Sequence, residues 1–335
     1  MVSLMGLFYR HFECSVLVNG RPSEWFTVES GVRQGCIMSP ILFLMAIDWV
    51  MRKTTADRPR GIQWTLFSHL EDLDFADDLA VLSSNLTHLQ EKTDRLNKFA
   101  EQTGLNINTA KTQVMCLNTT PRTPVTVNGH KLDYVEDFTY LGSLVSKEDA
   151  TQKDIRARLG KAHSVFIRLQ SIWKSKQYSL RTKVRLYNSN VKSVLLYGSE
   201  CWRVTVSDMK RIDAFHNRCL RKICRIFWPE RISSQELHRG TKCNSDALEI
   251  KRRHFRWLGH VFRMAPERIP KVALGWTPAG KRKRGRPKTT WRRTVAAELK
   301  EVNLTWGEAL HAAQDRTRWR QIVEALCPTR DEEDK

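Results

Sequence analysis

One short run, Leu73–Leu82, constrains the fold of this chain more than any other, because two adjacent carboxylates interrupt it. The run reads Leu-Asp-Phe-Ala-Asp-Asp-Leu-Ala-Val-Leu. Apolar residues at alternating positions around Asp77 and Asp78 are typical of two strands, and a polar pair between them is typical of a turn. The sequence therefore predicts a β-hairpin with both acids at its turn. Because Asp72 and Asp74 alternate with the apolar residues of the first strand, we expect their side chains to face outward.

The acidic pair of this hairpin indicates a metal site. Two carboxylates held close together repel each other and lose hydration, so a cation is needed to neutralise them. Mg²⁺ takes oxygen ligands, usually one or two carboxylates with water and substrate phosphates. We therefore expect Mg²⁺, or alternatively Mn²⁺, on Asp77 and Asp78, and phosphoryl or nucleotidyl transfer by a two-metal mechanism. The competing interpretation is an ordinary solvated turn, because Asp is common in turns.

Motifs on both sides of the hairpin complete a pattern. From Gly31 the chain reads Gly-Val-Arg-Gln-Gly-Cys-Ile-Met-Ser-Pro, and the downstream motifs are Gly104–Asn108 followed by Lys111-Thr112, and then Phe138–Gly142. In this order the motifs resemble the palm of reverse transcriptases of non-LTR (LINE-type) retrotransposons. The resemblance covers about residues 1–145. A looser similarity to the carboxy-terminal region of that family continues through Trp202, Trp257–His260 and Gly285–Pro287.

The resemblance implies a role for each motif. Asp77 is implied as the principal metal ligand with Asp78 beside it, and Lys111 as the residue that aids the departure of pyrophosphate. The implied substrate- and template-binding residues are Gln34, Gly35, Tyr140, Leu141 and Gly142. The implied partners are an RNA template, a DNA primer and deoxynucleotides. Taken singly, the motifs also fit a helix-entry loop, a solvated lysine and core residues.

The segment before Gln34 departs from the family pattern. The family places another catalytic aspartate on a strand there, whereas this segment predicts a short helix from Val2 and a hairpin with strands Glu13–Val18 and Trp25–Glu29 around an Asn-Gly turn. No acid precedes Glu13. We therefore expect an amino-terminally truncated palm with impaired nucleotidyl transfer, and a further chain as the source of the missing palm and fingers. The alternatives are an inactive remnant that binds nucleic acid and a metal-dependent nuclease.

Charge divides the chain in two. Residues 1–150 hold 14 Lys and Arg against 18 Asp and Glu, and residues 151–335 hold 42 against 18, so the net charges are −4 and +24. A surplus of this size favours salt-sensitive contact with nucleic-acid phosphates. Apolar residues at helical spacing follow in the second part. The predicted fold is α+β: a partial palm over 1–150, a helical thumb-like region over 151–265, and a basic linker with carboxy-terminal helices over 266–335.

Capping residues locate the helices of the basic part. Thr151 with Asp154, Ser179, Ser207 and Ser245 predict helix starts, and two final helices are expected after Trp291 and Trp306. The expected basic helix faces carry Arg218, Arg221, Lys222, Arg225, Lys251, Arg252, Arg253 and Arg256. Trp202 and Trp228 are candidates for base stacking, although tryptophans at helical spacing are more often core residues.

The densest basic run is a candidate nucleic-acid-binding segment. Its basic residues are Lys281, Arg282, Lys283, Arg284, Arg286 and Lys288. The Arg-Gly-Arg-Pro core resembles an AT-hook that enters the minor groove. A nuclear localisation signal fits the run equally well, and a solvated linker is the competing interpretation. No secretory signal is present, and the apolar stretch Cys36–Val50 is too short to cross a membrane. A nuclear or cytoplasmic protein with no membrane partner is expected.

Cysteines leave one further alternative open. The eight cysteines are spread over the chain, and reduced thiols are expected. The pairs Cys219 with Cys224 and His254 with His260 have spacings that can hold zinc. Ordinary core cysteines and surface histidines are the competing interpretation.

Overall fold

The chain divides into two units, Met1–Glu136 and Asp137–Lys335. The computed structural model describes residues 2–10, 12–28, 31–117, 123–277 and 290–326. The sequence places its first boundary later, at residue 150. The difference is the hairpin of residues 137–146, which packs against the first long helix of the second unit.

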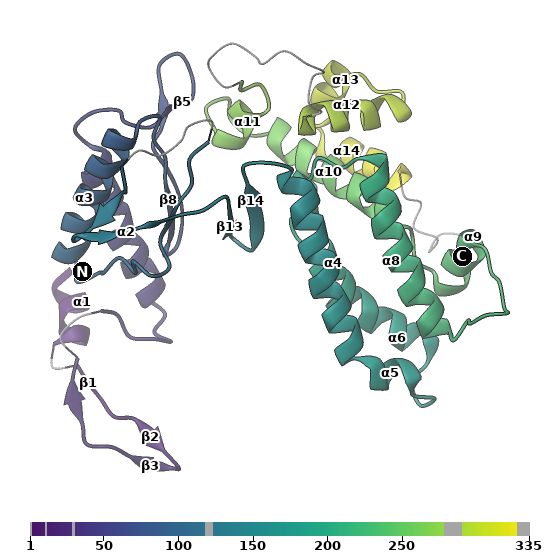
Figure 1. The fold of residues 1–335 in the computed structure, drawn as a ribbon, viewed down its shortest axis with the longest axis horizontal. Helices are drawn as coiled ribbons and strands as arrows, with labels where there is room; N and C mark the ends of the chain where they lie inside the picture. Colours follow the sequence, from purple (N-terminus) through teal and green to yellow (C-terminus); the bar gives the residue numbers. More distant parts are fainter. Residues whose placement is uncertain (1, 11, 29–30, 118–122, 278–289, 327–335) are drawn as a thin grey trace. The chain divides into compact units, whose positions relative to one another are not determined.

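The first unit begins with a helix and a long hairpin (Figure 1). Helix α1 spans Val2–Tyr9, and the four short strands that follow are β1 Glu13–Cys14, β2 Leu17–Val18, β3 Arg21–Pro22 and β4 Phe26–Thr27. β2 pairs with β3 and β1 with β4, both antiparallel. Asn19 and Gly20 turn the chain with φ of 51° and 79°, as a type I′ turn requires. The predicted hairpin is confirmed, although its return strand starts at Arg21.

Two helices form the main core of the first unit. Helix α2 spans Ser39–Thr55 and α3 spans Leu86–Gln102, with the Asn85 side chain capping the amide of Thr87. Their buried faces meet at Ile47, Val50, Met51, Leu96 and Ala100, and Leu79 and Val81 of the acidic hairpin pack against them. The hairpin is therefore fixed to the helices by one of its faces.

Short strand pairs complete the first unit. They are β5 Ile62–Gln63 with β6 His69–Leu70, β7 Asp72–Phe75 with β8 Asp78–Val81, β9 Gln113–Val114 with β12 Asp133–Tyr134, and β10 Thr126–Val127 with β11 His130–Lys131. All are antiparallel except the pair of β9 and β12. A mixture of helices and small, mainly antiparallel sheets confirms the predicted α+β class.

Lys92 of α3 holds the root of the acidic hairpin. It is fully buried, and its Nζ donates to the carbonyl oxygens of Glu71 at 2.9 Å and Leu82 at 2.7 Å. It also forms an ion pair with the carboxylate of Glu71. That carboxylate accepts from the amides of Arg60 at 3.0 Å and Gly61 at 2.9 Å. One buried cation thus joins α3 to the ends of both hairpin strands. Its partner Glu71 also binds the loop after α2 through the amides of Arg60 and Gly61.

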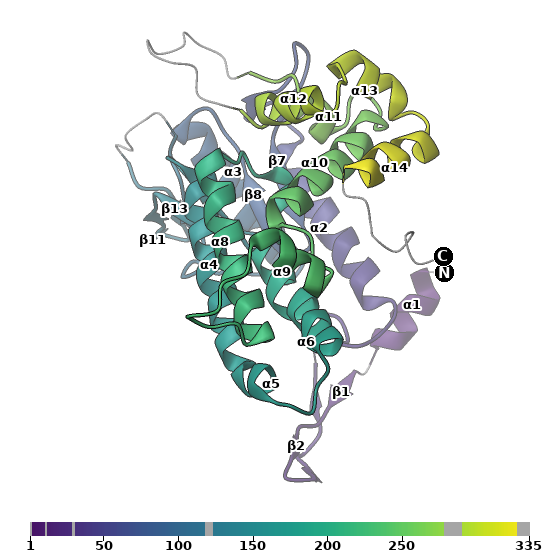
Figure 2. The same cartoon turned by 90° about the vertical axis from the view of Figure 1, so that its right-hand side faces the viewer.

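The second unit contains a hairpin followed by helices (Figure 1). The hairpin strands are β13 Asp137–Tyr140 and β14 Ser143–Ser146. The next elements are α4 Ala150–Arg168, α5 Gln170–Lys174, α6 Leu180–Leu186, the π-helical turn η1 Tyr187–Lys192, α7 Ser193–Leu195, the 3₁₀ turn η2 Ser199–Cys201, α8 Val206–Cys224, α9 Ser234–Thr241 and α10 Asp246–Phe262. Figure 2 shows α4, α6 and α8 running alongside one another. Their core includes Phe166 and Trp173, whose rings stack with centroids 5.2 Å apart.

The last helices gather around the end of α10. They are α11 Ile269–Ala273, α12 Trp291–Glu301, α13 Trp306–Ala312 and α14 Arg316–Ala325. Their core contains Phe255, Leu258, Val295, Leu299 and Trp319. The sequence predicts two final helices where the structure has three, because Asp315 caps a new helix with bonds to the amides of Thr317 and Arg318.

The predicted helix starts in the second unit are partly correct. Ser179 and Ser245 cap α6 and α10 as predicted. Helix α8 starts earlier than Ser207, because Thr205 and Asp208 form a reciprocal capping box. The predicted cap at Thr151 is wrong, since α4 begins at Ala150.

We expect Lys92→Met to loosen the acidic hairpin. The variant leaves two carbonyls and the Glu71 carboxylate without their cation, and breaking a buried ion pair in this way costs about 3–5 kcal/mol. Hydrogen exchange of residues 71–102 should accelerate, while the helices of the second unit serve as an internal reference. Lys98→Met, at an exposed position of the same helix, should leave exchange unchanged; equal acceleration in both variants would contradict the role of Lys92.

Candidate functional site

The acidic hairpin presents Asp77 at its tip. In the register of β7 and β8, Phe75 lies opposite Asp78, so Ala76 and Asp77 are the two turn residues. Ala76 has a φ of 54°, a conformation that usually favours glycine. Asp77 and Asp78 are both exposed. The predicted hairpin is confirmed, but only Asp77 of the two acids lies in the turn, because Asp78 pairs with Phe75 as the first residue of β8.

The two faces of the hairpin differ in character. Residues directly opposite each other in an antiparallel pair share a face, and here Asp74 is opposite Leu79 and Asp72 is opposite Val81. Leu79 and Val81 pack on α2 and α3. The expectation that these acids face outward is therefore wrong for Asp72, which is half-buried, whereas Asp74 on the same face is exposed. Phe75 and Asp78 share the other face, directed away from the helices.

Asp72 titrates unusually because of this placement. Burial raises the pKa of Asp72 to about 7, and the hydrogen bond with Asp74 and the charge of that neighbour act in the same direction. Asp72 thus holds a proton at a pH where an ordinary Asp is ionised. The sequence analysis did not predict the raised pKa of Asp72. The alternation of polar and apolar residues in one strand does not reveal which face of the hairpin is buried by the partner strand.

The Gln34-Gly35 motif forms an exposed turn before α2. Gly35 has a φ of 84°. Arg33 stabilises the turn, because its guanidinium lies 4.3 Å from the ring centre of Phe12 and its carbonyl accepts from the amide of Cys36 at 3.2 Å. The turn is a helix-entry loop, and the template-binding role of Gln34 and Gly35 stays a prediction.

Lys111 lies in a turn of the same unit. Its backbone amide donates to the Asn108 side chain at 3.2 Å, and the residue is exposed. Its charged group is therefore accessible to solvent. A role in pyrophosphate departure stays a prediction.

The Tyr140-Leu141-Gly142 motif forms the tip of the hairpin in the second unit. Leu141 and Gly142 have φ of 48° and 79°, as a type I′ turn requires. The carbonyl of Leu141 accepts from the hydroxyl of Tyr197 at 3.0 Å, and that of Gly142 accepts from the Arg158 guanidinium. Arg158 in turn lies 4.4 Å from the centre of the Tyr197 ring. The tip is thus clamped by two side chains from α4 and from the loop after α7.

A buried acid supports the same hairpin. Asp154 is 4% exposed and accepts from the amide of Leu144 at 3.0 Å and from the indole N–H of Trp202 at 2.8 Å. Trp202 is itself buried, so its predicted role as a stacking platform is wrong, whereas Trp228 is 84% exposed. No local pattern in the sequence indicates this contact, because Asp154 and Trp202 are far apart in the chain.

The remaining predicted binding residues fall into three groups. Lys281, Arg282, Lys283, Arg284, Arg286 and Lys288 lie outside the described residues. Arg221, Arg225 and Arg253 donate to backbone carbonyls within the second unit, and Lys251 and Arg252 pair with Glu301 and Glu249. These five residues are therefore not merely solvated. Arg218, Lys222 and Arg256 are exposed.

The zinc alternative finds no support in the described part of the chain. Cys219 lies in the first helical core, whereas His254 is fully buried in the second and its Nδ1 lies 2.9 Å from Glu298. His260 is exposed. Across the described ranges, no group of three or more His, Cys, Asp or Glu side chains is placed to hold a metal. Asp77 and Asp78 are the two exposed carboxylates at the tip of the acidic hairpin.

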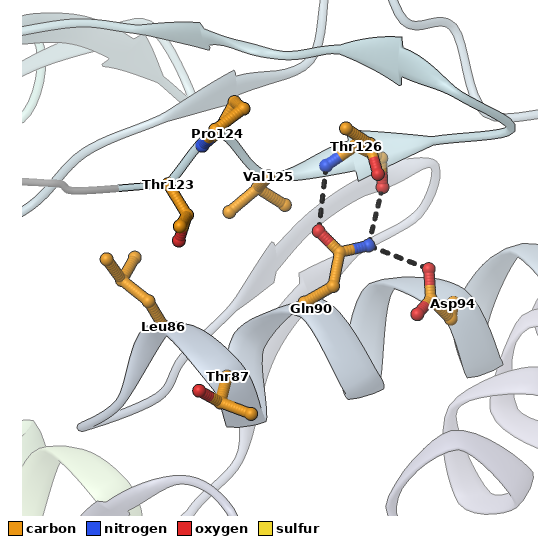
Figure 3. Close-up of a pocket in the computed structure, with 8 residues that line it drawn as sticks. All are labelled: Leu86, Thr87, Gln90, Asp94, Thr123, Pro124, Val125 and Thr126. Atoms are coloured by element: carbon orange, nitrogen blue, oxygen red, sulfur yellow. Dashed lines mark hydrogen bonds between the residues drawn. The ribbon is translucent and has the colours of Figure 1, made fainter.

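A separate cavity in the first unit is structural in character. It measures about 460 Å³ and lies between α3 and the strand that carries Thr126 (Figure 3). The Gln90 side chain accepts from the Thr126 amide and donates to the Thr126 carbonyl and to Asp94. None of the predicted site residues lines it.

In the described residues, no helix combines the length and apolar character of a membrane span.

Comparisons with known proteins concern both units. Residues 2–145 match the family described as reverse transcriptase (RNA-dependent DNA polymerase), and residues 165–197 match a domain of unknown function. An uncharacterized transposon-derived protein of Caenorhabditis elegans is 25% identical over 271 residues, which are 76% of this chain and 95% of that protein. The RNA-directed DNA polymerase from mobile element jockey of Drosophila funebris is 26% identical over 246 residues, 68% of this chain but only 25% of the relative. A retrovirus-related Pol polyprotein from the type-1 retrotransposable element R2 of Popillia japonica is 22% identical over 219 residues, 62% of this chain and 35% of the relative.

We expect Asp72→Asn to stabilise the protein at high pH only. The folded pKa of about 7 exceeds the ordinary value of 3.8, so the stability contributed by protonated Asp72 is present below pH 3.8 and is lost as the pH rises through 7. Because the group is partly exposed, screening limits the gain at pH 8 to about 1–2 kcal/mol. Urea unfolding at pH 5 and pH 8 measures this. Asp133→Asn, an exposed control, should show no such pH dependence; parallel curves for both variants would refute the assignment.

We expect Tyr197→Phe to loosen the tip of the second hairpin. The ring that faces Arg158 is retained, so only the hydrogen bond to Leu141 is lost, and one such bond contributes about 1 kcal/mol. Hydrogen exchange of residues 139–144 should become several-fold faster, without change in α8. Tyr178→Phe, at an exposed tyrosine, is the matched control. Unchanged exchange in Tyr197→Phe would show that the clamp contributes nothing.

Proposed function

Residues 2–145 of this chain belong to the reverse transcriptase family of the LINE type, and on that premise we propose that the chain takes part in RNA-directed DNA synthesis in a non-LTR retrotransposon. The reaction is nucleotidyl transfer from a deoxynucleotide to a DNA primer on an RNA template. The observation that carries the proposal is Asp77 at the exposed tip of the β7–β8 hairpin, within the matched residues. The chain spans only about a quarter of the jockey polymerase, so the whole reaction is a proposal.

The donor set of the hairpin tip fits a hard cation. Asp77 and Asp78 are exposed carboxylates on consecutive residues, and Mg²⁺ is commonly held by one or two carboxylates with water completing its shell. In this proposal Asp77 binds the ion and Asp78 assists. The bound metal supplies charge stabilisation at the transferred phosphate. The hairpin contributes a fixed position for the two carboxylates.

The same donor set limits the activity of this chain alone. A two-metal mechanism needs further oxygen ligands, and the only acids before Gln34 are Glu13, Glu24 and Glu29. The family position for another catalytic aspartate is not matched among them. We propose that nucleotidyl transfer by these residues alone is impaired, because no matching carboxylate lies among them. Lys111, Gln34 and the Tyr140–Gly142 tip keep their proposed roles toward pyrophosphate, template and primer.

A second candidate function is nucleic-acid binding without catalysis. The observation that favours it is the net charge of +24 over residues 151–335. Such a surplus binds phosphates through release of counterions and needs no metal. Under this alternative the first unit contributes structure only.

Primer extension on poly(rA)/oligo(dT) with Mg²⁺ tests the proposal. Asp77→Asn should lower extension at least about 100-fold, because it removes the principal ligand of a metal that stabilises the transition state. Asp133→Asn is the control, and binding of the same duplex should be retained in both. Extension that survives Asp77→Asn would exclude the hairpin as the site. No extension by the unchanged chain, with tight binding that falls steeply with salt, would favour the second function.

A further inference from the structure

Arginine dominates a cavity between α10 and α14 in the second unit. The cavity measures about 380 Å³. Its charged lining includes Arg252, Arg256, Arg263, Arg316 and Arg320, with Glu324 as the single carboxylate. Like charges brought together in this way repel one another unless an anion lies between them.

The convergence follows from how α14 is seated on α10. Trp319 is 3% exposed, and its indole N–H donates to the carbonyl of Phe255 at 2.9 Å. A Cβ at Gly259 would lie 2.0 Å from that indole nitrogen, so only glycine at this position admits the ring. Trp319 therefore fixes the two helices together and places Arg316 and Arg320 on the cavity that α10 lines.

The arginines of the cavity differ in what holds them. Arg263 donates to the carbonyl of Ala313 at 2.8 Å, and Arg252 lies 3.9 Å from Glu249. Within the described residues, the side chains of Arg256, Arg316 and Arg320 form no ion pair and no hydrogen bond. Burial lowers the pKa of Arg263, and the charge of Arg316 adds to this. Two guanidinium groups are thus anchored, and three remain available for a ligand.

We propose that this cavity binds the backbone phosphates of a nucleic-acid strand, an inference that rests on the nucleic-acid contact in the proposed function and names its site. Guanidinium groups match phosphate oxygens with two parallel hydrogen bonds. The ring of Trp319 offers no stacking face to a base, since it is buried and packed against Phe255. The cavity therefore recognises the backbone and not the bases, with little preference between DNA and RNA sequences.

A charge-matched pair of variants tests the site. The first carries Arg256→Gln, Arg316→Gln and Arg320→Gln. The control carries Arg156→Gln, Arg168→Gln and Arg181→Gln, three exposed arginines of α4 and α6 with the same total change in charge. Titration of a fluorescent oligonucleotide at several salt concentrations should show a loss of at least about tenfold for the first variant, with a salt slope lower by about 2–3. The control should retain most of the affinity; an equal loss in both would overturn the proposal in favour of diffuse attraction.

Two further measurements separate the remaining interpretations. Gly259→Ala displaces Trp319 without changing charge, and a folded variant, judged by circular dichroism, should bind more weakly; unchanged affinity would overturn the argument from geometry. If Gly259→Ala does not fold, the proposal is tested by the glutamine variants and their control alone. Inorganic phosphate or pyrophosphate that displaces the oligonucleotide at equal phosphate concentration would overturn the assignment to a strand. Because binding is measured without deoxynucleotides, failure of primer extension leaves this result unaffected, and loss of this site does not test the role of Asp77.

Discussion

The buried ammonium group of Lys92 is the constraint on which the acidic hairpin depends. A charge without water must find hydrogen-bond acceptors in the protein, and an unpaired one costs several kcal/mol. Lys92 finds the two carbonyls at the ends of the hairpin strands and the carboxylate of Glu71. Burial alone would raise the pKa of Glu71, but the hydrogen bonds from Lys92 and from the Gly61 amide lower it overall. The carboxylate stays charged, and the position of the hairpin root is fixed relative to α3.

The second unit also contains buried charged groups that pair with distant segments. Asp246 is fully buried, and its carboxylate lies 2.9 Å from the ammonium of Lys192. Burial lowers the pKa of the neighbouring His216 to about 3, which keeps it neutral beside the Tyr187 hydroxyl at 2.9 Å. Asp154 and Arg158 are also buried, and they bind the backbone of the second hairpin at Leu144 and Gly142. In each case a buried polar group pairs with a segment distant in sequence and so specifies how the elements pack.

Local patterns in the sequence predicted local structure well. The acidic hairpin, the Asn19-Gly20 turn and the caps at Ser179 and Ser245 depend on neighbouring residues, and the structure confirms them. Contacts between distant segments were not predictable in this way. Asp154 has the spacing of a capping acid, but its carboxylate accepts a hydrogen bond from the indole of Trp202 instead. The arginine cavity depends on the close contact between Gly259 and Trp319. The alternation at Asp72 was misleading because only the paired strand decides which face is buried.

Backbone strain is present at the tips of both hairpins. Ala76 and Leu141 both have positive φ, 54° and 48°, and such conformations cost a non-glycine residue about 1 kcal/mol or more. Each strained turn is held from outside: the first through the Lys92 root, the second through Tyr197 and Arg158. A strained tip persists only where its surroundings fix it, and such sites are concentrated at functional positions. The basic helices need no comparable precision, because attraction to phosphates depends mainly on charge. The requirement for precise geometry therefore lies at the two tips and at the seat of Trp319.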